Sequence, residues 1–423
     1  MTDHDNAGQA EHAMPVDSGG RLGSLDFTRG IAVMGILAAN IIAFGQPFSA
    51  YMYPSAFQVP HGDASGWMWI AQFVLIDGKM RGLFTLLFGA GLYLFMEKAW
   101  ARGATRWLQF RRLVWLLVFG LIHFFFIWRG DILTYYALIG MAALLCLRWA
   151  ARTQLVVGLI TYVVGALLYG AIMIPLAYIA DTPFGEGAAF AEMRQGLEEQ
   201  KQFALDDDAA FAALKTAGDY AGMTAHRFAE HGFEPLANVA LFALETFPLM
   251  LIGMALYRYG FFSGGLAAGK LRRWGWAGLL AGGALHLLIG LWVKAGGFTY
   301  YGTLAAFMGW SPLPRLLMVL GIAALLAVYG ARAHGWLGQR VSAAGRAAFT
   351  NYLGTSLVMA AVFHGWGLGL FGKLNRPELY LVVALACIAM LAWSKPWLDR
   401  FRYGPLEWLW RCLTYGRLFS LRR

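Results

Sequence analysis

Charged residues are scarce in this chain. Asp, Glu, Lys and Arg make up only 14% of its 423 residues, and 59% of the residues are hydrophobic. A soluble domain has about 25% charged and about 45–50% apolar residues, so the composition excludes an ordinary soluble enzyme and a disordered chain. The three cysteines, Cys146, Cys387 and Cys412, lie too far apart for a disulfide framework or a zinc motif.

Sequence motifs for metal and nucleotide chemistry are missing as well. The chain has no His-x-x-x-His spacing, no glycine-rich nucleotide loop after a strand, and no Gly-x-Ser-x-Gly nucleophile elbow. We therefore expect no bound metal and no soluble-hydrolase type of active site.

Glycine and basic charge, in contrast, are abundant. The chain has 52 glycines and a net charge of +10. Glycine-rich apolar segments favour close packing of helices in lipid. The basic residues form short clusters between apolar runs, which is typical of membrane topology signals and not of a nucleic-acid surface. We expect an all-α, polytopic membrane protein that contacts membrane lipid and binds no nucleic acid.

Ten segments are apolar and long enough to cross a bilayer. They are residues 30–48, 79–96, 113–128, 132–147, 155–180, 236–257, 274–293, 315–329, 347–365 and 379–393. The shorter apolar stretch 67–76 is either an interfacial or re-entrant piece or the outer extension of the second span. The first 20 residues are polar and lack a signal-peptide pattern, so 30–48 is expected to insert first.

The distribution of lysine and arginine predicts the orientation. With the N-terminus in the cytoplasm, 23 of the 34 Lys and Arg residues fall on the inner side, as the positive-inside rule requires. Both termini are then cytoplasmic. The expected parts are a polar tail (1–23), five spans (24–180), an outer lid of short helices (181–235), five further spans (236–394) and an interfacial helix with a basic tail (395–423). The lid holds 11 of the 24 acidic residues, and it is either simply solvated or involved in binding an acceptor.

Four polar side chains fall near the middle of their spans. At about 1.5 Å per residue, Asn40 and His123 lie roughly 16 Å, and Glu245 and His286 roughly 18 Å, from the inner ends. Ionisable groups at such a depth are costly, so they are candidates for function. Structural alternatives stand beside this interpretation. Glu245 is either a buried functional acid, alone or as the partner of His286, or a protonated side chain with local hydrogen bonds. Each histidine either takes part in chemistry or bonds a backbone carbonyl.

Two further sets of residues carry alternatives. Asp131 opens the fourth span, where it either caps the helix or forms an outer-mouth site with Arg129. Arginines at the inner ends either fix topology and contact headgroups or bind a phosphate-bearing ligand, because the guanidinium fork fits phosphate. The candidates for this second role are Arg29, Arg111, Arg112 and Arg346.

The residues at 21–40, RLGSLDFTRGIAVMGILAAN, resemble the opening of the YeiB-like family of bacterial membrane proteins. Further matching stretches follow along nearly the whole chain. They are KMRGLFTLLFGAG at 79–91, GLIH at 120–123 with GDIL at 130–133 and YA at 136–137, LIGM at 251–254, GRAAFTNY at 345–352 and GPLEW at 404–408. The chain is identified as a member of this domain-of-unknown-function family, which implies a multi-pass protein of the bacterial cytoplasmic (inner) membrane.

The resemblance also implies an activity, because the family is grouped with transmembrane acyltransferases such as heparan-α-glucosaminide N-acetyltransferase. The shared feature is an arginine followed eleven residues later by asparagine, here Arg29 and Asn40. The wider group has a histidine at the later position. The heparan enzyme has a luminal histidine before its second span, where His61 is the nearest one here. Because this chain has Asn40 at the later position, the resemblance leaves open which histidine is the base.

Acyl transfer from cytoplasmic acyl-CoA to a hydroxyl or amine is the activity that the resemblance implies. The acceptor would be a glycan, a lipid or a small molecule on the outer side or in the membrane. His123 is the candidate base, with Asp131 orienting it or Glu245 sharing its polar cavity. Asn40 would donate a hydrogen bond to the thioester oxygen. The CoA phosphates would contact Arg29, Arg111, Arg112 and Arg346.

Alternatives to this assignment remain. If His123 is structural, then His61, His286 and His364 are the other candidate bases. A secondary transporter of a small polar or anionic solute would also place charges and broken helices at the midplane. A third hypothesis is a non-catalytic sensor or scaffold that uses the acidic lid. Glycine-rich helix faces are consistent with a homodimer.

Overall fold

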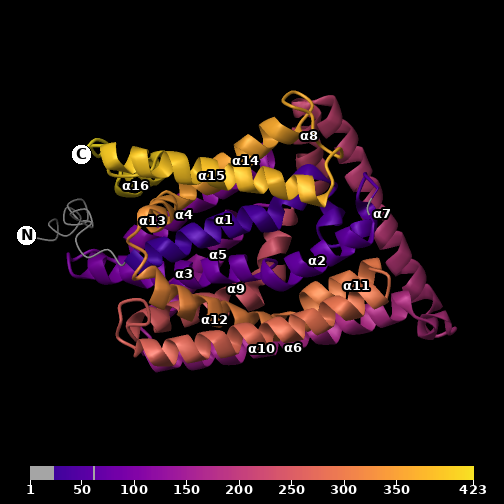
Figure 1. Cartoon of the computed structure of the whole chain (residues 1–423), viewed down its shortest axis with the longest axis horizontal. Helices are drawn as coiled ribbons and strands as arrows, with labels where there is room; N and C mark the ends of the chain where they lie inside the picture. Colours follow the sequence, from indigo (N-terminus) through magenta and orange to yellow (C-terminus); the bar gives the residue numbers. More distant parts are fainter. Residues whose placement is uncertain (1–22, 61) are drawn as a thin grey trace, which may run out of the picture.

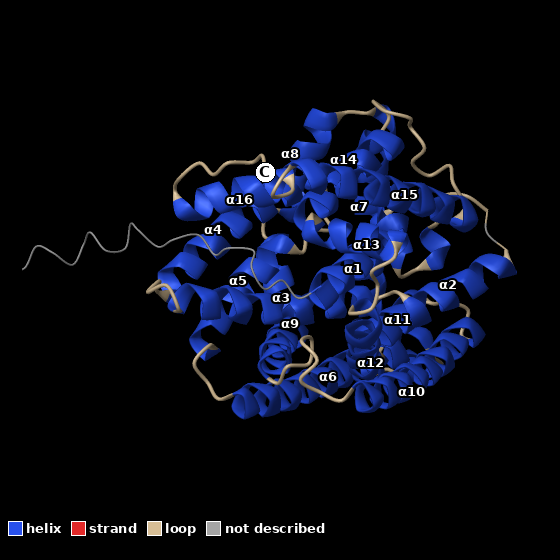
Figure 2. Cartoon of the chain, turned by 60° about the vertical axis from the view of Figure 1, so that its left-hand side comes forward, coloured by secondary structure: helices blue, strands red, loops and turns tan. Residues whose placement is uncertain are grey.

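The computed structural model describes residues 23–60 and 62–423, and the regular elements in that part of the chain are helices (Figure 2). The α-helices are α1 (Gly23–Gly45), α2 (Asp63–Leu75), α3 (Lys79–Trp100), α4 (Arg106–Ile122), α5 (Leu133–Ala143), α6 (Ala151–Asp181), α7 (Ala191–Ala217), α8 (Tyr220–His231), α9 (Glu234–Arg258), α10 (Ala268–Ala295), α11 (Tyr300–Leu304), α12 (Pro312–Gly330), α13 (Trp336–Arg346), α14 (Ala348–Phe363), α15 (Arg376–Arg400) and α16 (Pro405–Tyr415). The all-α expectation is confirmed there. Nearly all of the predicted tail at 1–23 lies outside the described residues.

Eight segments of the described chain are long and apolar enough to cross a membrane. They are α1, α2 with α3, α4 with the π-helical turn that follows it (His123–Ile127), α6, α9, α10, α12 and α15. Two more apolar helices are shorter, namely Leu133–Cys146, which includes α5, and α14. These two match the predicted spans 132–147 and 347–365. The multi-pass character is therefore confirmed, and the number ten stays a prediction.

The apolar stretch 67–76 lies in α2, which runs into α3 as one segment from Asp63 to Trp100. Of the two interpretations, the extension of the second span is the one observed. The join is at Gly78, whose φ is +72°. A Cβ there would lie 2.4 Å from Arg315 Nε. Glycine is needed for both reasons, the left-handed backbone and the close approach.

Glycine also brings helix backbones into contact inside the chain. A Cβ at Gly89 of α3 would lie 2.1 Å from the carbonyl oxygen of Met250 in α9. Gly278 and Gly282 of α10 likewise face carbonyl oxygens of α12. Small residues permit such close packing in membrane helices. Because these glycine faces are occupied within one chain, they do not argue for a homodimer, which stays a prediction.

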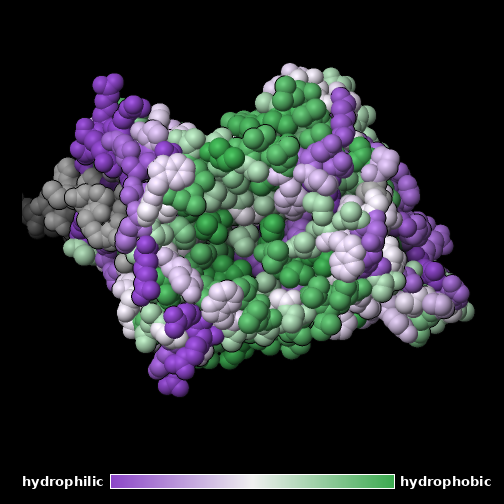
Figure 3. Space-filling view, viewed as in Figure 1, coloured by the Kyte–Doolittle hydropathy of each residue, from purple (hydrophilic) through white to green (hydrophobic). Residues whose placement is uncertain are grey.

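Helix α1 lies in the middle of the bundle and packs against α3, α12, α13, α14 and α15 (Figure 1). Hydrophobic residues cover much of the middle of the face seen in Figure 3, and hydrophilic residues gather toward its two ends. Helices α13 and α16 lie at one of these ends and α7 lies along the other (Figure 1). Such an apolar band between polar ends is what a bilayer requires of a spanning bundle.

The acidic segment 181–235 forms α7, of 27 residues, and α8, of 12 residues. The expectation of short helices is wrong for α7. Polar side chains three or four residues apart bond along the helix and support its length. These pairs are Gln195–Glu199, Lys201–Glu198 and Gln202–Asp206. The helix ends at Gly218, which adopts a left-handed conformation.

The placement of α7 and α16 at opposite ends generates a topology prediction. In a background without accessible cysteines, Asp206→Cys in α7 and Ser420→Cys in the tail should label oppositely with a membrane-impermeant thiol reagent in intact cells. Both positions are exposed, so lysed cells should label at both and serve as the control. Labelling of Ser420→Cys, but not Asp206→Cys, from outside would reverse the predicted orientation.

Candidate functional site

His123 opens the π-helical turn after α4, and its side chain is fully buried. Its Nδ1 lies 2.8 Å from Asp131 Oδ1, and its Nε2 lies 2.9 Å from Ser356 Oγ in α14. Widened turns of this kind are frequent at functional sites. Here the turn brings an imidazole between a carboxylate and a hydroxyl, and its two ring nitrogens have side-chain partners rather than a backbone carbonyl.

Asp131 orients the imidazole. Its second oxygen, Oδ2, accepts a hydrogen bond of 2.8 Å from the backbone N–H of Thr134 in the first turn of α5. A carboxylate only accepts, so the network assigns the proton to Nδ1 of His123 and leaves Nε2 to accept from the Ser356 hydroxyl. The Tyr352 carbonyl is a second possible acceptor for the Ser356 hydroxyl, but its oxygen lies farther away, at 3.4 Å from Ser356 Oγ. Helix capping and histidine orientation are thus both served by Asp131.

Ser356 is the member of this group that no sequence pattern singles out. It lies 233 residues from His123 along the chain. A lone serine in an apolar helix usually bonds the carbonyl one turn earlier. The sequence around Ser356 therefore gives no reason to expect a contact with His123.

Two pockets lie on either side of this group. The first, called the basic pocket, has a volume of about 340 Å³ and is lined by residues of α1, α3, α4, α5 and the segment from α13 to α16. Its basic lining residues are Arg29, Lys98, Arg112, Arg346 and Arg411. The second, called the lid-side pocket, has a volume of about 370 Å³. Its polar lining includes Asn40, Arg81, Arg129, Asp131, Glu234, Glu245 and Arg315.

A central cavity of about 10 Å³ lies between the two pockets. It is lined by both Ser356 and Asn40. It shares Tyr352 with the basic pocket, and it shares Ile36, Asn40 and Trp128 with the lid-side pocket. Ser356, whose hydroxyl is bonded to His123, therefore lines a small space that adjoins both pockets.

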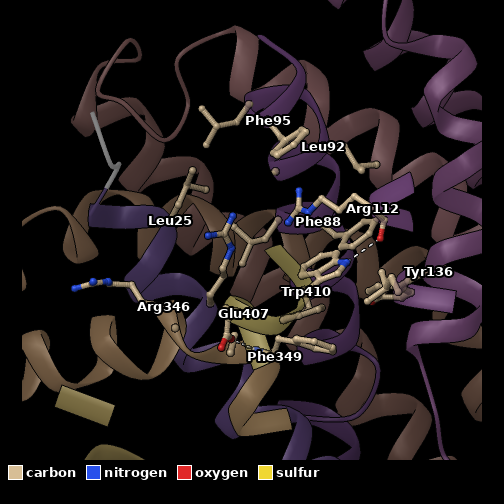
Figure 4. A pocket seen from close by; sticks show the side chains of 18 of the residues that line it. Leu25, Phe88, Leu92, Phe95, Arg112, Tyr136, Arg346, Phe349, Glu407 and Trp410 are labelled. Carbon is tan, nitrogen blue, oxygen red and sulfur yellow. Dashed lines mark hydrogen bonds between the residues drawn. The ribbon is translucent and has the colours of Figure 1, made fainter. Parts of the chain in front are cut away.

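Arg112 is the best-defined cation of the basic pocket. Its guanidinium carbon lies 4.7 Å from the Phe95 ring and 4.1 Å from the Trp410 ring, and Trp410 Nε1 donates to the Arg112 carbonyl (Figure 4). Aromatic faces hold a guanidinium in place without neutralising it. Of the four predicted phosphate-binding arginines, Arg29, Arg112 and Arg346 line the pocket.

Arg111 does not belong to that lining. Neighbours on a helix point about 100° apart, and the turn of α4 that aims Arg112 at Trp410 directs Arg111 toward Gly416. The prediction that both arginines face one pocket is therefore wrong for Arg111.

Glu245 is held by arginines and not by a histidine. Its Oε2 accepts from Arg81 at 2.7 Å and from Arg315 at 2.9 Å, on the wall of the lid-side pocket. The predicted pairing with His286 is wrong, since the sequence did not show that Arg81 and Arg315 would turn inward. Glu245 shares the lid-side pocket with Asn40 and Asp131, whereas His123, whose cavity it was expected to share, is not among the lining residues.

His286, the fourth of the polar residues predicted near the middle of a span, does not line the lid-side pocket with Asn40 and Glu245. Its Nδ1 bonds the Gly282 carbonyl of its own helix at 2.8 Å, and its ring packs against the edge of Phe73. The distance along the span predicts how deep His286 lies in the membrane, but it does not predict which face of the helix carries the side chain. His364 is buried beside Trp366 at the end of α14, and His61 lies outside the described residues.

Comparison with known proteins decides the family. Residues 256–417 match a family model described as "Protein of unknown function (DUF418)". The chain is 31% identical over 414 residues to an uncharacterized protein, YeiB, of Escherichia coli (strain K12), covering 92% of this chain and 95% of that protein. The chain belongs to the YeiB-like DUF418 family. It is also 31% identical over 407 residues to the uncharacterized protein YxaH of Bacillus subtilis (strain 168), covering 93% of this chain and 94% of that relative.

The predicted YeiB-like membership is thus confirmed, and no solved structure matches the chain. The part that matches the DUF418 model contains Ser356, Arg346 and Trp410, whereas His123 and Asp131 precede it. The group around His123 therefore joins the DUF418 region to the first half of this YeiB-like protein.

The buried arginine–glutamate cluster generates a stability prediction. Glu245→Gln leaves Arg81 and Arg315 without their shared anion, and an uncompensated buried charge costs about 3–5 kcal/mol. The variant should therefore unfold at a clearly lower temperature in detergent. Glu199→Gln, at an exposed position of α7, is the control and should change stability by less than about 0.5 kcal/mol. Equal melting temperatures for both variants would show that the cluster does not stabilise the fold.

Proposed function

We propose that this protein is a transmembrane acyltransferase that moves an acyl group from cytoplasmic acyl-CoA to a hydroxyl or amine on the outer side or in the membrane. The observation that carries the proposal is the group Asp131–His123–Ser356, in which Ser356 lines a central cavity that adjoins the basic pocket and the lid-side pocket. A carboxylate, an imidazole and a hydroxyl in this order form the arrangement that activates serine in acyl transfer.

The basic pocket suits the donor. CoA carries several phosphates, and Arg29, Arg112 and Arg346 supply positive charge on the wall of this pocket. The same wall contains the buried side chains Leu116 and Tyr136, which suits an acyl chain or the pantetheine arm. The lid-side pocket then receives the acceptor. Its volume of about 370 Å³ falls in the range of small-molecule sites, and the acceptor would be a small molecule or the reactive end of a glycan or lipid.

The chemistry follows from the direction of the hydrogen bonds. Ser356 Oγ attacks the thioester carbonyl carbon while its proton passes to His123 Nε2. The carbon–sulfur bond then breaks, the thiolate takes that proton, and CoA leaves as the thiol. In the second half, the acceptor attacks the acyl-serine ester, gives its proton to His123, and Ser356 Oγ recovers a proton as the ester bond breaks. Asn40, in the same central cavity, would donate to the developing oxyanion.

The central cavity of about 10 Å³ is too small for an acyl group. Each half-reaction therefore requires one wall to open, Tyr352 toward the basic pocket or Trp128 toward the lid-side pocket. A covalent acyl-serine between two such walls explains how transfer proceeds without an open path through the membrane.

A secondary transporter of a small polar or anionic solute is the second candidate. It is favoured by Arg81 and Arg315 on the wall of the lid-side pocket, which suit an anion, and by pockets at both ends of the bundle. Turnover of an acyl-CoA thioester distinguishes the two candidates, because a transporter leaves the thioester intact.

The donor site predicts a difference between two adjacent arginines. Arg112→Ala removes a charged phosphate partner and should weaken acetyl-CoA binding about tenfold or more, most strongly at low salt. Arg111→Ala, which does not line the pocket, is the control and should leave binding within about twofold of the wild type. Titration calorimetry of the purified protein measures both. Equal losses in the two variants would move the donor site away from the basic pocket.

The catalytic group predicts loss of activity at His123 and Ser356. His123→Gln keeps hydrogen bonding but cannot act as a base, so acyl transfer, or thioester hydrolysis without an acceptor, should fall at least about 10²-fold. The activity of Ser356→Ala should fall by a similar factor. Without acceptor, the wild type incubated with acetyl-CoA should gain the mass of one acetyl group, located on Ser356.

Two controls make these outcomes specific. His286→Gln, at a buried histidine remote from the group, should retain activity, and both active-site variants should still bind acetyl-CoA. Full activity of Ser356→Ala with no acyl-enzyme would assign His123 to direct deprotonation of the acceptor. Full activity of His123→Gln would contradict the proposed site altogether.

A further inference from the structure

A second cluster of reactive side chains lies in the lid, away from Ser356. Asp207 of α7 and His226 and His231 of α8 bring one ligand-type atom each to within 4.8 Å of one another. His226 Nε2 lies 2.8 Å from Asp207 Oδ1, and His231 Nε2 lies 3.1 Å from Asp207 Oδ2. Two imidazole nitrogens therefore converge on the two oxygens of one carboxylate.

The orientation of His231 is the informative detail. Its Nε2 is buried, and its contact with Asp207 lacks the geometry of a hydrogen bond, so this nitrogen has no hydrogen-bond partner among the described residues. Its Nδ1 lies 3.2 Å from Glu234 Oε2 at the start of α9. A carboxylate behind one ring nitrogen, with the other nitrogen facing further ligands, is how proteins usually orient a metal-binding histidine.

The charge of the cluster also suits a cation. Arg129 donates to Asp207 Oδ2 at 3.1 Å and to Glu234 Oε2 at 2.6 Å. With neutral imidazoles, the two carboxylates and one guanidinium leave a net charge of −1.

We propose that Asp207, His226 and His231 bind a zinc-class divalent cation, with water in the fourth position. Two nitrogens and one carboxylate oxygen form a donor set that Zn²⁺ accepts in tetrahedral geometry. Donors about 2.0–2.1 Å from such an ion lie about 3.3 Å apart, and the three ligand atoms here already lie within 4.8 Å of one another. Glu234 remains in contact with Nδ1 of His231, and Arg129 remains bonded to Glu234 and Asp207.

The bound ion would fasten the lid over the lid-side pocket. Asp207 belongs to α7 and the two histidines to α8, while Arg129 and Glu234 line that pocket. Three ligands from two helices would hold α7 and α8 together, and the bond from Arg129 to Asp207 connects them to the wall of the pocket. This role is independent of the proposed acyl transfer and holds equally for a transporter.

The test uses the full chain, purified in detergent without a polyhistidine tag and treated with EDTA. Titration with ZnCl₂ should give one high-affinity site per chain by calorimetry and by metal analysis after gel filtration, and Co²⁺ should give the visible spectrum of a tetrahedral complex. His226→Ala and Asp207→Asn should each weaken Zn²⁺ binding at least tenfold. Glu234→Gln should weaken it about 10–100-fold as an outer-shell change.

His334→Ala, which removes an exposed histidine outside the lid, is the matched control and should bind Zn²⁺ like the wild type. Absence of a one-to-one site or of a tetrahedral Co²⁺ spectrum in the wild-type chain would overturn the proposal, whether or not the variants fold. Unchanged affinity in folded His226→Ala and Asp207→Asn would overturn it as well, since the ion would then bind elsewhere.

Discussion

The hydrocarbon core of a membrane contains no water, so each polar group placed there must find its partners within the protein. This constraint explains the interior of the bundle. Lys79 donates to the Phe73 carbonyl, and Arg81 and Arg315 share Glu245. His123 satisfies both of its nitrogens with side chains. These contacts hold Lys79, Glu245 and His123 in defined orientations, which is what a preorganised site needs.

The sequence was sufficient to predict the class of fold. Long apolar runs and basic clusters depend only on local composition, and they correctly predicted a multi-pass helical membrane protein. The lid shows where local composition fails. Its alanine-rich text has weak periodicity, so the length of α7 was not predicted, although pairs such as Gln195 with Glu199 support one long helix. Spans shorter than the bilayer, such as α14, are equally hard to count from hydropathy alone.

The candidate site was predictable only in part, for a geometric reason. Distance along a span gives depth, which correctly brought Asn40 and Glu245 to one pocket. Rotation about the helix axis is set by packing, and a change of one residue turns a side chain by about 100°. That rotation separates Arg111 from Arg112 and directs His286 to its own helix. Ser356 was missed because its contact with His123 joins distant parts of the chain.

The loop after the π-helical turn links the lid to the buried histidine. Arg129 binds Asp207 and Glu234 at the mouth of the lid-side pocket, and Asp131, two residues later, binds His123. Between α4 and α5, Trp128 stacks on Phe44 with ring centroids 4.1 Å apart, which limits how far the loop can move. Arg129 and Asp131 therefore connect the lid and the buried imidazole through one short loop. The contacts of the lid and the orientation of the imidazole depend on the same few residues of chain.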